Sequence, residues 1–81
     1  MLTGLVISVQ EQDKTWEGKS YKQLEVGITN GKKTWFFRQS DTQGPLPAVA
    51  PFTRATIEVQ SAQTEKGNTV VRGVFLSNGR V

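Results

Sequence analysis

Hydrophobic and polar residues alternate, with some irregularity, over five stretches of the chain, which is the pattern of β-strands that bury one side. The clearest stretch runs from Tyr21 to Thr29 and places Leu24, Val26 and Ile28 on one side. The other predicted strands are Leu2 to Gln12, Thr34 to Ser40, Arg54 to Gln63 and Thr69 to Leu76. No stretch has the 3.6-residue period of a helix, so the sequence predicts an all-β fold.

Segments without this alternation are predicted as connections. The first follows Asp13-Lys14 and runs through Ser20, and the last hairpin turns between Thr64 and Asn68. Asp41 to Thr53 holds all three prolines, which lack a backbone donor and interrupt both helices and central strands. It is therefore predicted to be a Pro-rich loop between strands three and four, and Ser77 to Val81 a loose tail.

Asn30-Gly31 is the strongest turn signal, because these residues readily adopt the positive φ angles of a type I′ turn. Such a two-residue turn pairs Thr29 with Lys32, Ile28 with Lys33, Val26 with Trp35 and Leu24 with Phe37. Trp35 and Phe37 then point into the core. Phe36 and Arg38 share the opposite face with Tyr21.

Five strands with a long interruption after the third predict one domain, residues 1–81, folded as a small five-stranded OB-type barrel. An SH3-like barrel is the competing architecture. A chain of 81 residues leaves much of its surface wet, so association would add stability. The strands after Pro51 favour a two-fold homodimer, because they offer more apolar surface than one sheet face needs. The residues concerned are Val70, Val71, Val74, Phe75 and Leu76.

Composition excludes several classes of function. The chain has no cysteine and no histidine, so it lacks a thiol, an imidazole base, a disulfide and soft metal ligands. Gly18-Lys19-Ser20 imitates the end of a phosphate-binding P-loop, but Asp13 stands where that motif needs a glycine. We therefore expect a binding protein without a cofactor, not an enzyme. No apolar run can span a bilayer and no signal peptide is recognisable, which predicts a cytoplasmic protein with no membrane partner.

Positive charge gathers in one region, although the net charge of +3 is modest. Residues 14–38 contain six cations and two carboxylates, a net charge of +4, whereas the first thirteen residues carry −2. A localised basic region suits a polyanionic partner, with a merely solvated surface as the alternative.

Aromatic and basic side chains occur together on the second and third strands and in the loop before them. Flat rings stack on unpaired bases, and cations between the rings contact phosphates. The candidate binding residues are Lys14, Trp16, Lys19, Tyr21, Lys32, Phe36, Arg38 and Lys66. They predict binding of single-stranded DNA, with RNA as the alternative.

The same rings also have structural interpretations. Tyr21 and Phe36 could be covered by a dimer partner or by the Pro-rich loop, and Trp16 could pack against its own loop. An adaptor barrel that contacts another protein would use the same aromatic surface.

Two short motifs stand at strand boundaries: Gly18-Lys19-Ser20-Tyr21 opens the second strand, and Pro47-Ala48-Val49-Ala50-Pro51 precedes the fourth. In these motifs and in strand order the chain resembles the gene V single-stranded-DNA-binding proteins of filamentous bacteriophages. The resemblance implies an OB-type fold, a symmetric dimer, and coating of phage single strands in the host cytoplasm during replication. It also implies that Tyr21 stacks on a base beside the cation of Lys19. The family carries an aromatic residue at the tip of the last hairpin, where Glu65-Lys66-Gly67-Asn68 has none.

Overall fold

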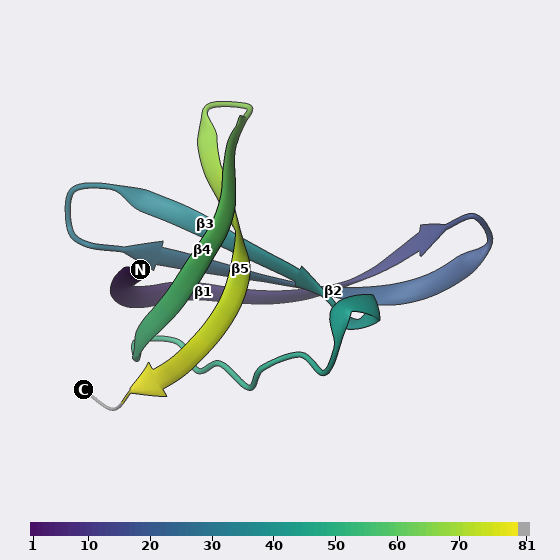
Figure 1. Ribbon diagram of the computed structural model, residues 1–81, viewed down its shortest axis with the longest axis horizontal. Coiled ribbons are helices and arrows are strands. Elements are labelled where there is room, and N and C mark those ends of the chain that lie inside the picture. Colours follow the sequence, from purple (N-terminus) through teal and green to yellow (C-terminus); the bar gives the residue numbers. More distant parts are fainter. Residues whose placement is uncertain (80–81) are drawn as a thin grey trace.

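The computed structural model describes residues 1–79, and in this range five strands close into a barrel (Figure 1). The strands are β1 (Leu2–Trp16), β2 (Lys19–Thr29), β3 (Thr34–Ser40), β4 (Arg54–Glu65) and β5 (Asn68–Gly79). A single 3-10 turn, η1 (Asp41–Gln43), follows β3, and residues 44–53 then lead to β4 without regular structure. The prediction of an all-β domain with five strands is confirmed.

The strands lie in the order β1-β2-β3-β5-β4, and β4 closes the ring against β1. All neighbours are antiparallel except β3 and β5, which are parallel and pair only from Trp35 to Phe37. β1 pairs with two neighbours: Leu2 to Leu5 pair with β4, and Leu5 to Trp16 pair with β2. A β-bulge between Val6 and Ser8 bends the strand where it changes partner. The Val6 N–H there donates to Thr53 O at 2.8 Å, and Val6 O accepts from the Phe52 N–H at 2.7 Å, so the segment before β4 is hydrogen-bonded to β1 at the bend.

The core fills the barrel with aliphatic side chains and one phenylalanine. Phe37 is fully buried, and its ring lies 6.0 Å from that of Phe75, tilted by 53°. The buried cluster comprises Val6, Leu24, Val26, Ile28, Phe37, Ala55, Ile57 and Val71. Trp35 packs against this cluster but is only half-buried, and the Lys33 ammonium lies 5.5 Å from its ring centroid. Trp35 therefore lies at the rim of the core.

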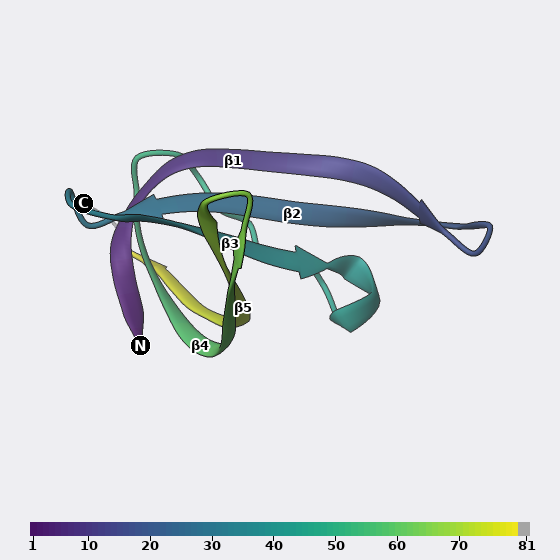
Figure 2. The same cartoon turned by 90° about the horizontal axis from the view of Figure 1, so that it is seen from above.

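Two hairpins are longer than the sequence predicts. β1 and β2 stay paired as far as Trp16 and Lys19, so the predicted loop through Ser20 is wrong. Glu17 (φ +49°) and Gly18 (φ +76°) make the tight turn, with the two positive φ angles that a type I′ turn requires. Figures 1 and 2 show this hairpin projecting well beyond the rest of the barrel. The β4–β5 hairpin closes in the same way at Lys66 (φ +49°) and Gly67 (φ +83°).

The predicted type I′ turn at Asn30-Gly31 is wrong. Residues 30–33 form a four-residue loop in which Asn30 Oδ1 accepts hydrogen bonds from the Lys32 and Lys33 backbones at 2.9 and 2.8 Å. An asparagine side chain can replace a backbone acceptor in this way, which removes the need for two positive φ angles. Pairing consequently moves by two residues, so that Ile28 opposes Trp35 and Val26 opposes Phe37.

A shift of two residues keeps every side chain on its predicted face. Phe37 lies in the core and Trp35 against it, while Phe36 faces Gly27 on the other side of the sheet. The prediction of which β3 side chains point into the core is thus confirmed, whereas the predicted cross-strand partners are wrong. At the other end of the chain, β5 continues to Gly79, so the predicted loose tail is wrong for residues 77–79. The rest of that predicted tail, Arg80 and Val81, lies outside the described residues.

Candidate functional site

β1, β2 and β3 share an outer face, on the side of the sheet away from the core. Cross-strand partners lie on the same side of a sheet, and the pairs Lys14 with Tyr21 and Gly27 with Phe36 lie opposite to the side of Phe37. Six candidates from the sequence share this outer face by register: Lys14, Trp16, Lys19, Tyr21, Phe36 and Arg38. They are spread along the face, with Trp16 at one end and Phe36 towards the other.

The projecting hairpin forms one wall of a hollow of about 570 Å³ on this face. Trp16, Lys19 and Tyr21 line that wall, and Arg72 from β5 lines the hollow as well. Trp16 and Lys19 are direct cross-strand partners, so an indole, an ammonium group and a phenol lie within two residues of each other along the ribbon. The Trp16 side chain is 68% exposed, which means that it adds little to the core and stays open to a ligand.

Phe36 lies half-buried over Gly27, farther along the outer face. A Cβ atom on Gly27 would lie 2.5 Å from the Ser8 hydroxyl oxygen and 3.6 Å from the Phe36 ring. Glycine at this position therefore lets β1 and the ring approach the β2 backbone closely. Phe36 also borders a second hollow, of about 170 Å³, beside Lys66 at the tip of the β4–β5 hairpin.

Arg38 is held by two carboxylates. Its Nε donates to Glu25 Oε2 at 2.7 Å, and its Nη1 donates to Glu65 Oε1 at 3.0 Å. The hydrogen bond to Glu25 raises the pKa of Arg38 most, and the bond to Glu65 raises it further against the opposing effect of burial. The pKa of the Glu65 carboxyl is lowered, first by a hydrogen bond from Gln63 and then by Arg38. Arg38 thus fastens the β4–β5 hairpin to β3, and its charge is compensated in the folded protein.

Lys32 lies apart from the other candidates. It belongs to the loop of residues 30–33, at the opposite end of β2 from Lys19. β2 contains 11 residues. The hollow reaches along β2 as far as Gln23, and the six residues from there to Thr29, next to the loop, span about 20 Å at about 3.3 Å per residue.

The acidic side chains of β1 lie on the reverse side of the hairpin. Glu11 forms an exposed ion pair with Lys22 at 3.4 Å, and Asp13 is the cross-strand partner of Lys22. Both carboxylates alternate with Gln12 and Lys14 along the strand, so they face away from Trp16 and Tyr21. The hairpin therefore presents Lys14, Lys19 and the two rings on one side, and two carboxylates beside Lys22 on the other.

Two exposed residues lie outside the set of candidates predicted from the sequence. Arg72 is an exposed cation on β5 that directly follows the inward-facing Val71, and alternation alone could have placed it on the surface. Its position beside the hollow follows from the parallel pairing of β3 and β5, which no local signal announces. Phe52 is 71% exposed with φ +63°, a conformation that a bulky side chain rarely adopts, and its backbone N–H donates to Val6 O at 2.7 Å.

Comparison with protein-family models, with characterised proteins and with solved structures gave no match for this chain. The likeness to the gene V proteins is thus a resemblance of short motifs. Within residues 1–79, no three acidic side chains gather where they could hold a metal ion, and no helix is long and apolar enough to cross a membrane.

Proposed function

We propose that this protein binds single-stranded nucleic acid, DNA in preference to RNA, with little dependence on base sequence, and that it is not an enzyme. The observation that carries the proposal is the hollow in which Trp16, Lys19 and Tyr21 lie together on an outer sheet face. Exposed rings accept bases of any kind, and neighbouring cations contact the phosphates, so such a surface binds single strands without reading their sequence.

The strand order supports the finer proposal that the barrel is an OB fold. In OB folds, oligonucleotides bind across the second and third strands, between the loops that join strands one to two and four to five. Here the candidates lie on β2 and β3, with the β1–β2 hairpin at Trp16 and the β4–β5 hairpin at Lys66 on the flanks. Taken with the gene V motifs, this arrangement favours coating of phage single strands during replication. Equal affinity for RNA and DNA in a competition assay would instead favour an RNA-binding barrel.

Tryptophan fluorescence tests the proposal directly, because the two indoles differ in environment. Trp16 lines the hollow, whereas Trp35 packs against the core on the other side of the sheet. Titration with a dT12 single strand should quench emission, and a duplex of equal length should not. Trp16→Phe should remove the quenching, while fluorescence anisotropy of labelled dT12 still reports binding. No binding at low salt would favour the protein-contact alternative, and quenching that persists in Trp16→Phe would place the site elsewhere.

Salt dependence of the same titration measures the phosphate contacts. Lys14, Lys19, Lys66 and Arg72 are exposed cations in or beside the site, and each phosphate contact releases condensed counterions. With three or four contacts at about −0.7 each, the slope of log affinity against log salt should be about −2 to −3. A slope near zero would mean that the basic region is only a solvated surface.

Glu65→Gln is expected to strengthen binding about two- to five-fold, because Arg38 loses one of its two carboxylate partners and Arg72 loses the attraction of the same carboxylate. Glu58→Gln is the matched control: it removes the same charge from the same strand, at an exposed position with no ion pair in the described part of the chain. Anisotropy titrations compare the two variants. An equal gain in both would reduce the effect to net charge and contradict the role given to Arg38.

We also propose a two-fold homodimer. The apolar surface left for a dimer contact is smaller than the sequence predicts, because Val70 and Val71 are buried within the subunit. Val74 and Leu76 remain 46% and 45% exposed on β5. Light scattering at micromolar concentration should give twice the subunit mass, and Leu76→Asp should give the subunit mass with an unchanged circular dichroism spectrum. A monomeric wild-type protein would remove the claim.

A further inference from the structure

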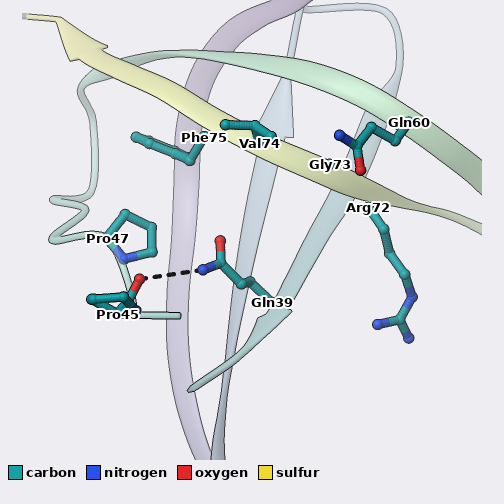
Figure 3. A pocket seen from close by; sticks show the side chains of 8 residues that line it. All are labelled: Gln39, Pro45, Pro47, Gln60, Arg72, Gly73, Val74 and Phe75. Carbon is teal, nitrogen blue, oxygen red and sulfur yellow. Dashed lines mark hydrogen bonds between the residues drawn. The ribbon is translucent and has the colours of Figure 1, made fainter. Parts of the chain in front are cut away.

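A cleft of about 420 Å³ opens where β3 and β5 separate. The two strands pair in parallel only as far as Phe37 and Val71, and beyond this point each pairs with its other neighbour alone. Residues 44–49 cross the end of the barrel there, and Leu46 and Val49 pack against the core. The cleft is therefore a consequence of the topology, and Figure 3 shows Val74 and Phe75 of β5 above it, Gln39 of β3 below, and Pro45 and Pro47 of the connecting segment at the left.

The walls of the cleft combine flat apolar surfaces with amides. Pro45, Pro47 and Phe75 supply the apolar contact, and Gln39 and Gln60 supply the amides. Figure 3 shows the Gln39 amide directed toward Pro45, where its Nε2 donates to the Pro45 carbonyl at 3.3 Å. This bond fixes the amide and leaves its Oε1 and second N–H for a ligand. A planar heterocycle with donors and acceptors on its edge fits this chemistry, and the volume lies within the range of about 300 to 1,000 Å³ of small-ligand sites.

Arg72 stands at the border between this cleft and the hollow of Trp16 and Tyr21, because it lines both. It is exposed, and none of the ion pairs in the described part of the chain includes it. Arg38, by contrast, is bound to Glu25 and Glu65. The Glu65 carboxylate attracts Arg72 electrostatically but forms no ion pair with it, so the forked donors of this guanidinium are open to a phosphate.

We propose that the cleft is a nucleobase subsite and that Arg72 binds the phosphate that links its nucleotide to the one stacked in the hollow. The inference rests on the proposed binding of single strands. It gives the strand a path from Trp16 and Tyr21 across Arg72 into the gap between β3 and β5. The amides of Gln39 and Gln60 contact the edge of the base, and the proline and phenylalanine rings contact its faces.

Arg72→Ala tests the phosphate contact, with Arg54→Ala as the matched control. Arg54 is also an exposed arginine without an ion pair in the described residues, and it lines a different hollow, beside the loop of residues 30–33. Arg72→Ala should bind dT12 about ten-fold more weakly, the loss of one charge-assisted contact, and its salt slope should be less negative by about 0.7. Arg72→Lys should restore the slope because it keeps the charge. Arg54→Ala should change neither quantity.

Nuclear magnetic resonance tests the base contact. Addition of dT12 should shift the side-chain NH₂ signals of Gln39 and Gln60 and the Nε–H signal of Arg72. A 12-mer with the same backbone but no bases should shift the Arg72 signal and leave the two glutamine signals in place. If dT12 binds but Arg72→Ala binds as tightly as wild type, or the two glutamine signals stay in place, the subsite is refuted and the proposed function stands. If the wild-type protein does not bind dT12 at all, the proposed function itself fails.

Discussion

Phe37→Ala is expected to lower the free energy of unfolding by about 3 to 5 kcal/mol, the range for emptying a buried phenylalanine site. Phe37 is fully buried and opposes Val26 on β2 and Val71 on β5. It therefore lies in the strand that joins the antiparallel β2–β3 pair to the parallel β3–β5 pair. Small domains are stable by as little as about 5 kcal/mol, so this change should unfold much of the protein at room temperature. Urea denaturation followed by circular dichroism measures the loss.

The two neighbouring aromatics on β3 serve as controls. Trp35→Ala should cost less than Phe37→Ala, because the indole lies at the rim of the core and water can fill the space that it leaves. Phe36→Ala should cost least, since its ring lies on the outer face over Gly27. If Phe36→Ala were instead the most destabilising of the three, the inward and outward faces of β3 would be reversed.

The sequence correctly predicts which side of β3 faces the core, because this depends only on whether the register is shifted by an even or an odd number of residues. Asn30 closes a four-residue loop through its side chain, whereas the sequence predicts a two-residue turn. The pairing of Trp35 and Phe37 changes by two positions, and an even shift leaves each side chain on its original face. A burial pattern is thus read from sequence more reliably than a register, which depends on the chemistry of a single turn.

The projecting part of the β1–β2 hairpin could not be predicted from periodicity. Alternation arises because one side of a strand is buried, but residues 10–20 are all exposed, so both sides face water and Trp16 is the one large apolar side chain in the stretch. The turn at Glu17-Gly18 was visible only as a glycine in a polar stretch. A consequence for function is that Trp16 belongs to a paired strand with a fixed partner, Lys19, and not to a flexible loop.

The charges of the site depend on contacts between distant segments. Arg38 and Glu65 are 27 residues apart, and they meet because β5 lies parallel to β3 and brings the β4–β5 hairpin with it. The same pairing brings Arg72 to the hollow. Alternation within single strands identifies outward-facing cations, but it cannot tell which of them is compensated. The sequence therefore offers Arg38 as a phosphate contact, while the structure favours Arg72.

Tyr21→Ala is expected to weaken binding of single-stranded DNA by about 1 to 3 kcal/mol, the loss of one stacking platform. Tyr21 is half-buried beside Trp16 and Lys19 in the hollow and is absent from the core cluster, so the thermal melt should change little. Tyr21→Phe should bind almost as well as wild type, because it keeps the ring and loses only the hydroxyl. Anisotropy titrations with labelled dT12 measure all three proteins.

A pair of lysine variants on the same strand separates stacking at this site from general electrostatic attraction. Lys19 shares the outer face with Tyr21, whereas Lys22 points to the reverse side and pairs with Glu11. Lys19→Ala should weaken binding several-fold and make the salt slope less negative by about 0.7, while Lys22→Ala should leave the slope unchanged. Equal losses in the two lysine variants, together with full binding by Tyr21→Ala, would show that the strand does not lie on this face, because only Lys19 is placed beside Tyr21 while Lys22 lies on the reverse side in an ion pair with Glu11.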